Sequence, residues 1–126
     1  MKTINVGLLG CGTVGTGVAK LLIDNASVIA ARLGATLNLK RVADIDIETD
    51  RGIQFAQGVL TTDADAVVND PDIEIVIEMI GGEGIAKELI LKAIENGKQV
   101  ITANKALLAN QGNMLFAAAA EKGVDL

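Results

Sequence analysis

A glycine-rich run near the start of the chain constrains the fold more than any other feature of the sequence. It follows an apolar stretch, residues 4–9, precedes a stretch with helical character, and consists of Gly10, Cys11, Gly12, Thr13, Val14 and Gly15. Strand, glycine turn and helix in this order suit a dinucleotide pyrophosphate. The first glycine permits the tight turn, the second lets the backbone approach the phosphates, and the third lets the helix pack closely on the strand. Because a helix N-terminus also offers free N–H groups to an anion, the run predicts a dinucleotide site.

Composition narrows the class of protein further. Half of the 126 residues are hydrophobic, yet Phe55 and Phe116 are the only aromatic residues and histidine is absent. A core of Ile, Leu, Val and Ala is typical of a buried parallel sheet covered by helices. The net charge of -5 and the lack of a basic cluster argue against nucleic acid or an anionic membrane as a partner. A single cysteine, Cys11, fits a reducing cytoplasm.

The order of apolar and polar segments predicts alternating strands and helices within one domain, residues 1–126. Thr62 is expected to cap a short helix, Pro71 to break it, and residues 44–58 to form an irregular loop. This alternation predicts an α/β fold of three layers, a Rossmann-type doubly wound parallel sheet. The expected strands cover residues 2–9, 36–43, 73–80 and 99–102, with a further strand opening at 124–126, and the expected helices cover residues 13–25, 26–33, 63–69, 85–96 and 114–122.

Asp44 is the candidate partner of the adenosine ribose, because it ends the second expected strand and its carboxylate can accept hydrogen bonds from the hydroxyls. Asp46 competes for this role. A carboxylate here repels a 2′-phosphate, which favours NAD over NADP, although the nearby Arg41 and Arg51 weaken that preference. The alternative is that Asp44 simply ends a strand in solvent.

A polar quartet, Thr102, Ala103, Asn104 and Lys105, follows the last short strand. This location brings Lys105 to the ligand edge of the sheet, where an ammonium can hold a substrate carboxylate or take part in proton transfer. The alternative is a solvated lysine at the start of a helix. Glu78 interrupts a buried strand near the same edge, and either a ligand contact or a structural hydrogen bond would account for it. Cys11 is interpreted as a packing residue, since no histidine exists to activate it, and no metal site is expected.

Three segments, residues 7–15, 76–82 and 102–109, resemble homoserine dehydrogenase in sequence and in order. The resemblance implies a nicotinamide-dependent oxidoreductase that interconverts L-homoserine and L-aspartate 4-semialdehyde, on the route to threonine, methionine and isoleucine. It also implies a catalytic role for Lys105 beside the nicotinamide and the substrate. The backbone implied to line the cofactor belongs to Ile80, Gly81, Gly82, Thr102, Ala103 and Asn104.

Members of that family continue into a substrate and dimerisation domain, and many add a regulatory domain. Neither is expected in this chain, so the resemblance implies a cofactor-binding half that binds NAD or NADP weakly and has no activity alone. The complete enzyme is expected to be a cytoplasmic homo-oligomer. Two alternatives remain open: a stand-alone nucleotide-binding regulatory module, or the cofactor domain of another dehydrogenase in amino-acid metabolism.

Overall fold

The computed structural model describes residues 2–126, so Met1, the first residue of the expected domain, lies outside the described residues. Helices and strands alternate along the chain as the sequence predicts. In order they are β1 (Lys2–Leu9), α1 (Thr13–Asp24), α2 (Ala26–Leu33), β2 (Ala35–Ala43), β3 (Leu60–Thr61), α3 (Asp65–Val68), β4 (Ile73–Glu78), α4 (Ile85–Glu95), β5 (Gln99–Thr102) and α5 (Lys105–Lys122).

The five strands form one parallel sheet in the order β3-β2-β1-β4-β5. The chain starts in the middle of the sheet, moves outward to β3 and then crosses back to β4 on the other side of β1. The strand order therefore reverses between β1 and β4, and open sheets of this kind bind ligands at that crevice, beyond the carboxyl ends of the strands. The predicted Rossmann-type fold is confirmed.

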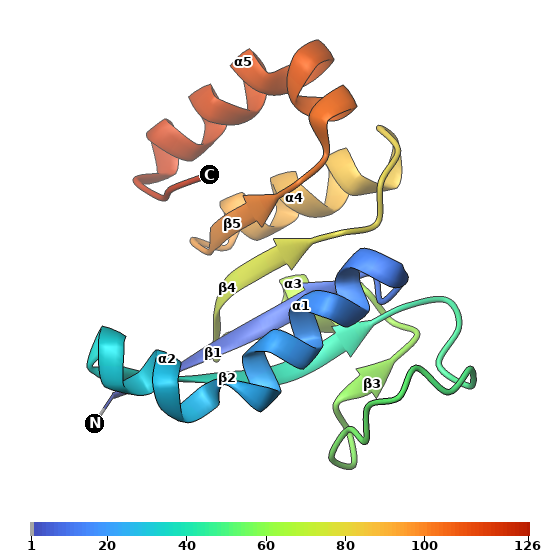
Figure 1. The fold of residues 1–126 in the computed structure, drawn as a ribbon. Coiled ribbons are helices and arrows are strands. Elements are labelled where there is room, and N and C mark those ends of the chain that lie inside the picture. The colour runs from blue at the N-terminus through green and yellow to red at the C-terminus, as the bar shows by residue number, and fades with distance from the viewer. Residues whose placement is uncertain (1) are drawn as a thin grey trace.

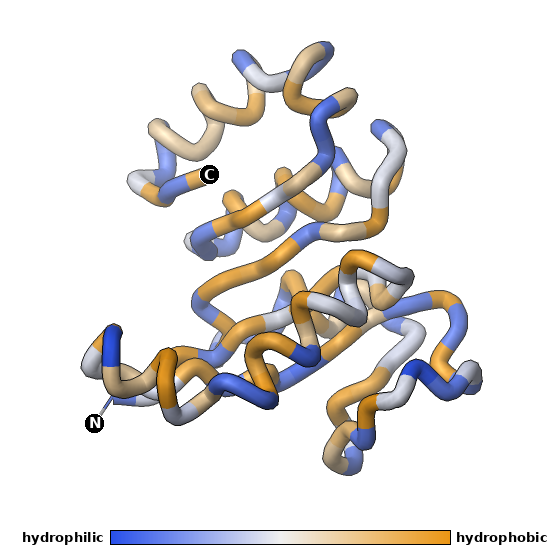
Figure 2. Tube along the Cα trace, viewed as in Figure 1, coloured by the Kyte–Doolittle hydropathy of each residue, from blue (hydrophilic) through white to orange (hydrophobic). Residues whose placement is uncertain are grey.

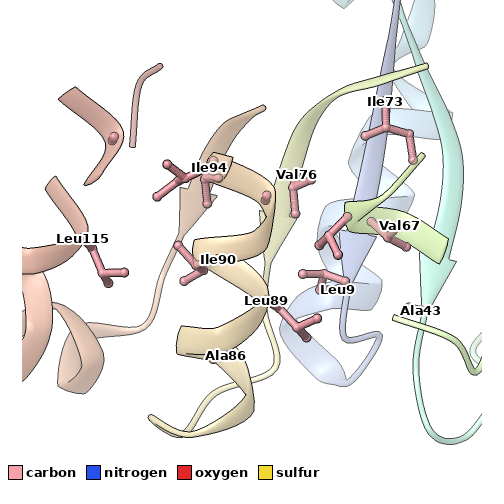
Figure 3. Close-up of a cluster of buried hydrophobic side chains, with 14 of the residues drawn as sticks. Leu9, Ala43, Val67, Ile73, Val76, Ala86, Leu89, Ile90, Ile94 and Leu115 are labelled. Atoms are coloured by element: carbon pink, nitrogen blue, oxygen red, sulfur yellow. The ribbon is translucent and has the colours of Figure 1, made fainter. Parts of the chain in front are cut away.

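Helices cover both faces of the sheet and complete three layers (Figure 1). On one face, α1 and α2 pack over β1 and β2, where Leu8 and Ala19 belong to one buried cluster. On the other face, α3 and α4 cover a second cluster that includes Leu9 and Ile90, and α5 packs against α4. Figure 3 shows Leu89 of α4 beside Leu9 of β1, with Ile90 and Ile94 on the side of α4 that faces Leu115 of α5. Neighbouring residues of β1 thus enter opposite cores, as the alternation of side chains along a strand requires.

The short helix α3 begins later than the sequence predicts. Ala64, and not Thr62, is its N-cap, and no side chain caps it. The carboxylate of Asp63 instead accepts the N–H of Asp65, so the turn before the helix is closed by an aspartate. The preceding strand β3 was not predicted, because two residues carry no periodicity that a sequence can reveal.

The end of β4 and the start of α5 also differ from the prediction. β4 ends at Glu78, because its own carboxylate accepts the N–H groups of Ile80 and Gly81 and turns the backbone out of the sheet. α5 begins at Lys105, nine residues before the predicted start at 114, because the Asn104 side chain caps the helix by accepting the N–H of Leu107. Residues 124–126 run beside β5 with one backbone hydrogen bond, from Val100 to Asp125, and are not a strand.

Hydrophobic residues concentrate in the strands and hydrophilic residues in the connections, as in the loop after β2 (Figure 2). Within residues 2–126, no single helix has both the length and the apolar character needed to cross a membrane. The consecutive helices α1 and α2 meet that criterion only as a pair, and they are bent by 71° at their junction.

Candidate functional site

The three glycines after β1 have different surroundings. Gly10 has a φ of +90°, and a Cβ there would lie 2.9 Å from the carbonyl carbon of Met79. A Cβ on Gly15 would lie 2.1 Å from the carbonyl oxygen of Gly10, so this glycine lets α1 approach the turn. A Cβ on Gly12 would meet nothing within 4 Å. Gly10 and Gly15 therefore shape the turn, whereas Gly12 leaves bare backbone facing open space.

The N-terminus of α1 presents unpaired donors at this turn. The first backbone bond of the helix runs from the N–H of Thr16 to the carbonyl of Gly12, at 2.8 Å. The N–H groups of Thr13, Val14 and Gly15 precede it and have no acceptor within the helix. No side chain caps the helix at Gly12. These amides and the positive end of the helix dipole form the kind of surface that binds a phosphate.

Cys11 faces the interior. Its side chain is 0% exposed, and its Sγ lies 3.6 Å from the Thr16 hydroxyl oxygen. Its backbone N–H donates to Oδ2 of Asp44 at 2.6 Å. The packing interpretation of Cys11 agrees with this burial, and the N–H is already used to hold the turn.

Asp44 directly follows β2 and is the better placed of the two candidate carboxylates. Besides accepting from Cys11, it accepts the N–H of Asp46 through Oδ1 at 2.9 Å, which leaves lone pairs of both oxygens available. The Asp46 carboxylate is instead occupied within its own loop, where the Thr49 hydroxyl above all lowers the pKa of Asp46. Of the two arginines considered, Arg51 lies near Asp44, with Nη2 3.7 Å from Oδ1. Arg41 binds Asp70 and the carbonyl of Gly58.

A cavity of about 500 Å³ opens between the glycine turn and the ends of β2 and β4. Its wall is mainly apolar, which suits a flat aromatic base, and Asp44 stands at its polar side. The residues that line it are Gly10, Gly12, Ala43, Asp44, Ile45, Thr62, Ala64, Met79, Ile80, Ile85 and Leu89.

The ends of β4 and β5 form the other half of this edge. Lys105, the first residue of α5, is exposed and takes part in no ion pair among residues 2–126. The buried carboxylate of Glu78 accepts a hydrogen bond from the Thr102 hydroxyl at 2.5 Å. Asn104 caps α5, and its amide nitrogen also donates to the carbonyl of Gly82. The predicted residues of this half therefore lie on two linked loops.

The structure brings part of the predicted site together in one cavity: Gly10, Gly12, Asp44 and Ile80 line the same wall. Gly81, Gly82 and the quartet 102–105 lie on the same edge of the sheet but outside the lining of that cavity. The apolar wall, above all Ile45, Ile85 and Leu89, is not predicted from the sequence. Ile45 comes two residues after the end of β2, whereas Ile85 and Leu89 belong to α4, and apolar residues at these places resemble ordinary core residues.

The chain is similar to known proteins over nearly its whole length. A sequence profile described as "Homoserine dehydrogenase, NAD binding domain" matches residues 10–126. The homoserine dehydrogenase of Methylobacillus glycogenes is 54% identical over 109 residues, which are 86% of this chain and 26% of that protein. That of Bacillus subtilis (strain 168) is 42% identical over 126 residues, which are 100% of this chain and 29% of that protein.

Solved structures agree with this assignment. The crystal structure of a homoserine dehydrogenase from Thiobacillus denitrificans superimposes with a TM-score of 0.89 at 49% identity, covering 98% of this chain and 28% of that one. The chain thus spans between a quarter and a third of the length of these relatives. Sequence profile, relatives and fold agree, and the chain belongs to the homoserine dehydrogenase family, whose NAD-binding domain it matches.

Proposed function

We propose that this chain binds NAD or NADP for an oxidoreductase that interconverts L-homoserine and L-aspartate 4-semialdehyde. The observation that carries the proposal is the uncapped N-terminus of α1, which faces open space at Gly12 beside the point where the strand order reverses. The names of the family and of the relatives support homoserine as the substrate that is oxidised.

The adenosine half of the dinucleotide belongs on the side of β2. Amides of Gly12, Thr13, Val14 and Gly15 hold the pyrophosphate, and Asp44 accepts hydrogen bonds from the ribose hydroxyls. The apolar cavity beside Asp44 is of a size and character to take the adenine ring. The N–H of Cys11 is bonded to Asp44, so Cys11 supports the turn through its backbone and its buried side chain.

The nicotinamide half belongs on the side of β4 and β5, because a dinucleotide spans the crevice at the point where the strand order reverses. Backbone of Ile80, Gly81 and Gly82 lines one side, and Thr102, Ala103 and Asn104 line the other. When bound, the nicotinamide ring donates or accepts the hydride. The exposed ammonium of Lys105 holds the substrate carboxylate or takes part in proton transfer beside it.

Substitution of Gly12 by valine tests the glycine turn. A Cβ at Gly12 has nothing within 4 Å, so we expect the fold to accommodate a valine there. The same side chain occupies the space proposed for the pyrophosphate, and titration calorimetry should show loss of NAD binding. Gly17→Val is the matched control, because a Cβ at Gly17, which lies within α1, has nothing within 4 Å either.

We expect Gly17→Val to bind NAD like the unmodified chain, with circular dichroism spectra unchanged for both variants. Unaltered NAD affinity in Gly12→Val would remove the glycine turn from the site. Absence of NAD and NADP binding by the unmodified chain would refute the proposed function itself.

The remaining proposals concern the complete enzyme. We propose that residues 1–126 act as the dinucleotide-binding domain, and that residues outside this sequence recognise the substrate and form a homo-oligomer. A cytoplasmic location is consistent with Cys11, which is buried and is the single cysteine of residues 1–126.

A further inference from the structure

A buried carboxylate at the end of β4 has no role in the proposed function. Glu78 is 0% exposed and forms no ion pair among the residues that the structure describes. Burying a charge is unfavourable unless hydrogen bonds satisfy it. They do: Oε2 accepts the N–H groups of Ile80 at 2.8 Å and Gly81 at 3.1 Å, and Oε1 accepts the Thr102 hydroxyl at 2.5 Å.

These bonds are part of a closed ring that joins two loops. The Thr102 hydroxyl oxygen accepts the N–H of Asn104 at 3.0 Å, and the Asn104 side chain donates to the carbonyl of Gly82. Gly82 adjoins Gly81, which donates to Glu78 and so closes the ring. The ring therefore ties the loop after β4 to the turn after β5.

The ring determines the geometry of both segments at the proposed nicotinamide edge. Gly81 and Gly82 have φ values of +83° and +74°, and a Cβ on either would meet nothing within 4 Å. The two glycines carry no side chain that could pack, and the hydrogen bonds of the ring tie them to the turn after β5. On the other side, Oδ1 of Asn104 accepts the N–H of Leu107 at 3.1 Å and starts α5, so the backbone of Lys105 is oriented by a member of the ring.

We propose that Glu78 is a positioning residue which, through Thr102 and Asn104, holds the loops 80–82 and 102–105 in the arrangement that binds the nicotinamide half of the dinucleotide. The inference rests on the proposed function, because it assigns the two halves of the cofactor to the two sides of the crevice. Glu78 itself is buried and touches no ligand. Its effect reaches the ligand through the backbone that it fixes.

Comparison of NAD with ADP-ribose, which lacks the nicotinamide ring, tests the inference in the chain as it stands. The unmodified chain should bind NAD more tightly than ADP-ribose. Thr102→Val keeps the side-chain shape but removes the hydroxyl that links Glu78 to Asn104. We expect it to reduce that preference by about tenfold, a change of ~1.4 kcal/mol, with ADP-ribose affinity unchanged within about twofold. Thr102→Ser restores the hydroxyl and should restore the preference.

A second variant cuts the ring at a different bond. Asn104→Ser keeps an oxygen that can cap α5, yet a serine side chain is too short to donate to Gly82, so the fold is retained. It should also lower the preference for NAD over ADP-ribose. If thermal denaturation shows that Thr102→Val does not fold, Asn104→Ser decides whether the ring controls the preference for NAD.

A third variant changes Glu78 itself, and its control comes from the other end of the same strand. Glu78→Gln should weaken the preference, since an amide cannot both accept from the two N–H groups and accept the Thr102 hydroxyl. Glu74→Gln, at an exposed position of β4, should leave both affinities unchanged. If no version of the chain binds either ligand, the proposed function fails. If the unmodified chain binds both equally, or the ring variants change both affinities in parallel, the positioning role is overturned while the dinucleotide site stands.

Discussion

At the scale of single residues, the glycine turn shows how one spacing serves three different physical needs. Gly10 requires a positive φ, Gly15 a close approach of two backbones, and Gly12 an open surface. The spacing of these three glycines is sufficient to predict their roles from the sequence. The bond between Asp44 and the N–H of Cys11 could not be predicted, because the two residues are 33 positions apart and meet only when β1 and β2 pair.

The Asp44 carboxylate should control the choice between NAD and NADP. Asp44→Asn keeps an oxygen for the Cys11 amide but removes the charge that repels a 2′-phosphate, and Arg51 remains nearby to attract it. We expect the ratio of NADP to NAD dissociation constants to fall by about tenfold, or ~1.4 kcal/mol, in fluorescence titrations.

Asp46→Asn is the control for this variant, because its carboxylate is bonded within its own loop. Its NADP to NAD ratio should match that of the unmodified chain. If Asp46→Asn changes the ratio and Asp44→Asn does not, the ribose partner is Asp46.

At the scale of elements, a cluster of charges fixes the connection from α3 to β4. The ammonium of Lys98, 3% exposed, donates to the carbonyls of Asp70 at 2.5 Å and Ile73 at 2.7 Å, and burial lowers the pKa of Lys98. The Asp70 carboxylate lies 2.8 Å from Lys40 and 3.3 Å from Arg41. Pro71 is enough to predict that the helix ends before β4. The charged residues that stabilise the connection come from β2 and from the residue before β5, and only the fold brings them together.

Loss of the Asp70 charge should destabilise the protein in a pH-dependent way. Burial raises the pKa of Asp70, but hydrogen bonds from Lys40, the N–H of Asp72 and Arg41 outweigh it, so that the pKa lies below the ordinary 3.8. A carboxyl group whose pKa is lowered in the folded state stabilises the fold at pH values above the pKa that the group has in the unfolded chain. That contribution disappears as the pH falls through the folded value.

Asp70→Asn should therefore lower the free energy of unfolding by about 1 kcal/mol near neutral pH, since its partners Lys40 and Arg41 are partly open to solvent, which screens the pairs. The difference should shrink as the pH falls below 3.8. Urea denaturation across this range measures it, with Asp72→Asn, an exposed neighbour, as the control. An equal loss at every pH would assign the effect to packing.

At the scale of the whole molecule, the two edges of the sheet have different tasks. The carboxyl ends of the strands carry the glycine turn, Asp44, Glu78 and Lys105, whereas the cluster around Asp70 braces the connection that enters β4. The chain spans 26–29% of the length of curated relatives such as those from Methylobacillus glycogenes and Bacillus subtilis. Binding of the cofactor by this chain and catalysis by a complete enzyme therefore have to be measured separately.

The chain by itself should bind NAD without oxidising homoserine. We propose that substrate recognition requires residues beyond this sequence. Lys105 by itself then cannot orient homoserine for hydride transfer. Absorbance of the reduced nicotinamide should not rise when homoserine and NAD are added, while a complete homoserine dehydrogenase assayed in parallel gives turnover. Sustained reduction of NAD by this chain would show that the substrate site lies within it.

The sequence by itself determined the alternation of the main strands and helices, the Rossmann-type fold class and the position of the glycine turn, but neither β3 nor the absence of a strand at residues 124–126. These features depend on periodicity and on glycine, which act over a few neighbouring residues. The tertiary structure alone decided the apolar wall around Ile45 and Leu89, the bond from Cys11 to Asp44, and the ring that joins Glu78 to Thr102 and Asn104. Each of these joins residues from separate strands, and such residues become neighbours only through the pairing of parallel strands, which no local pattern encodes.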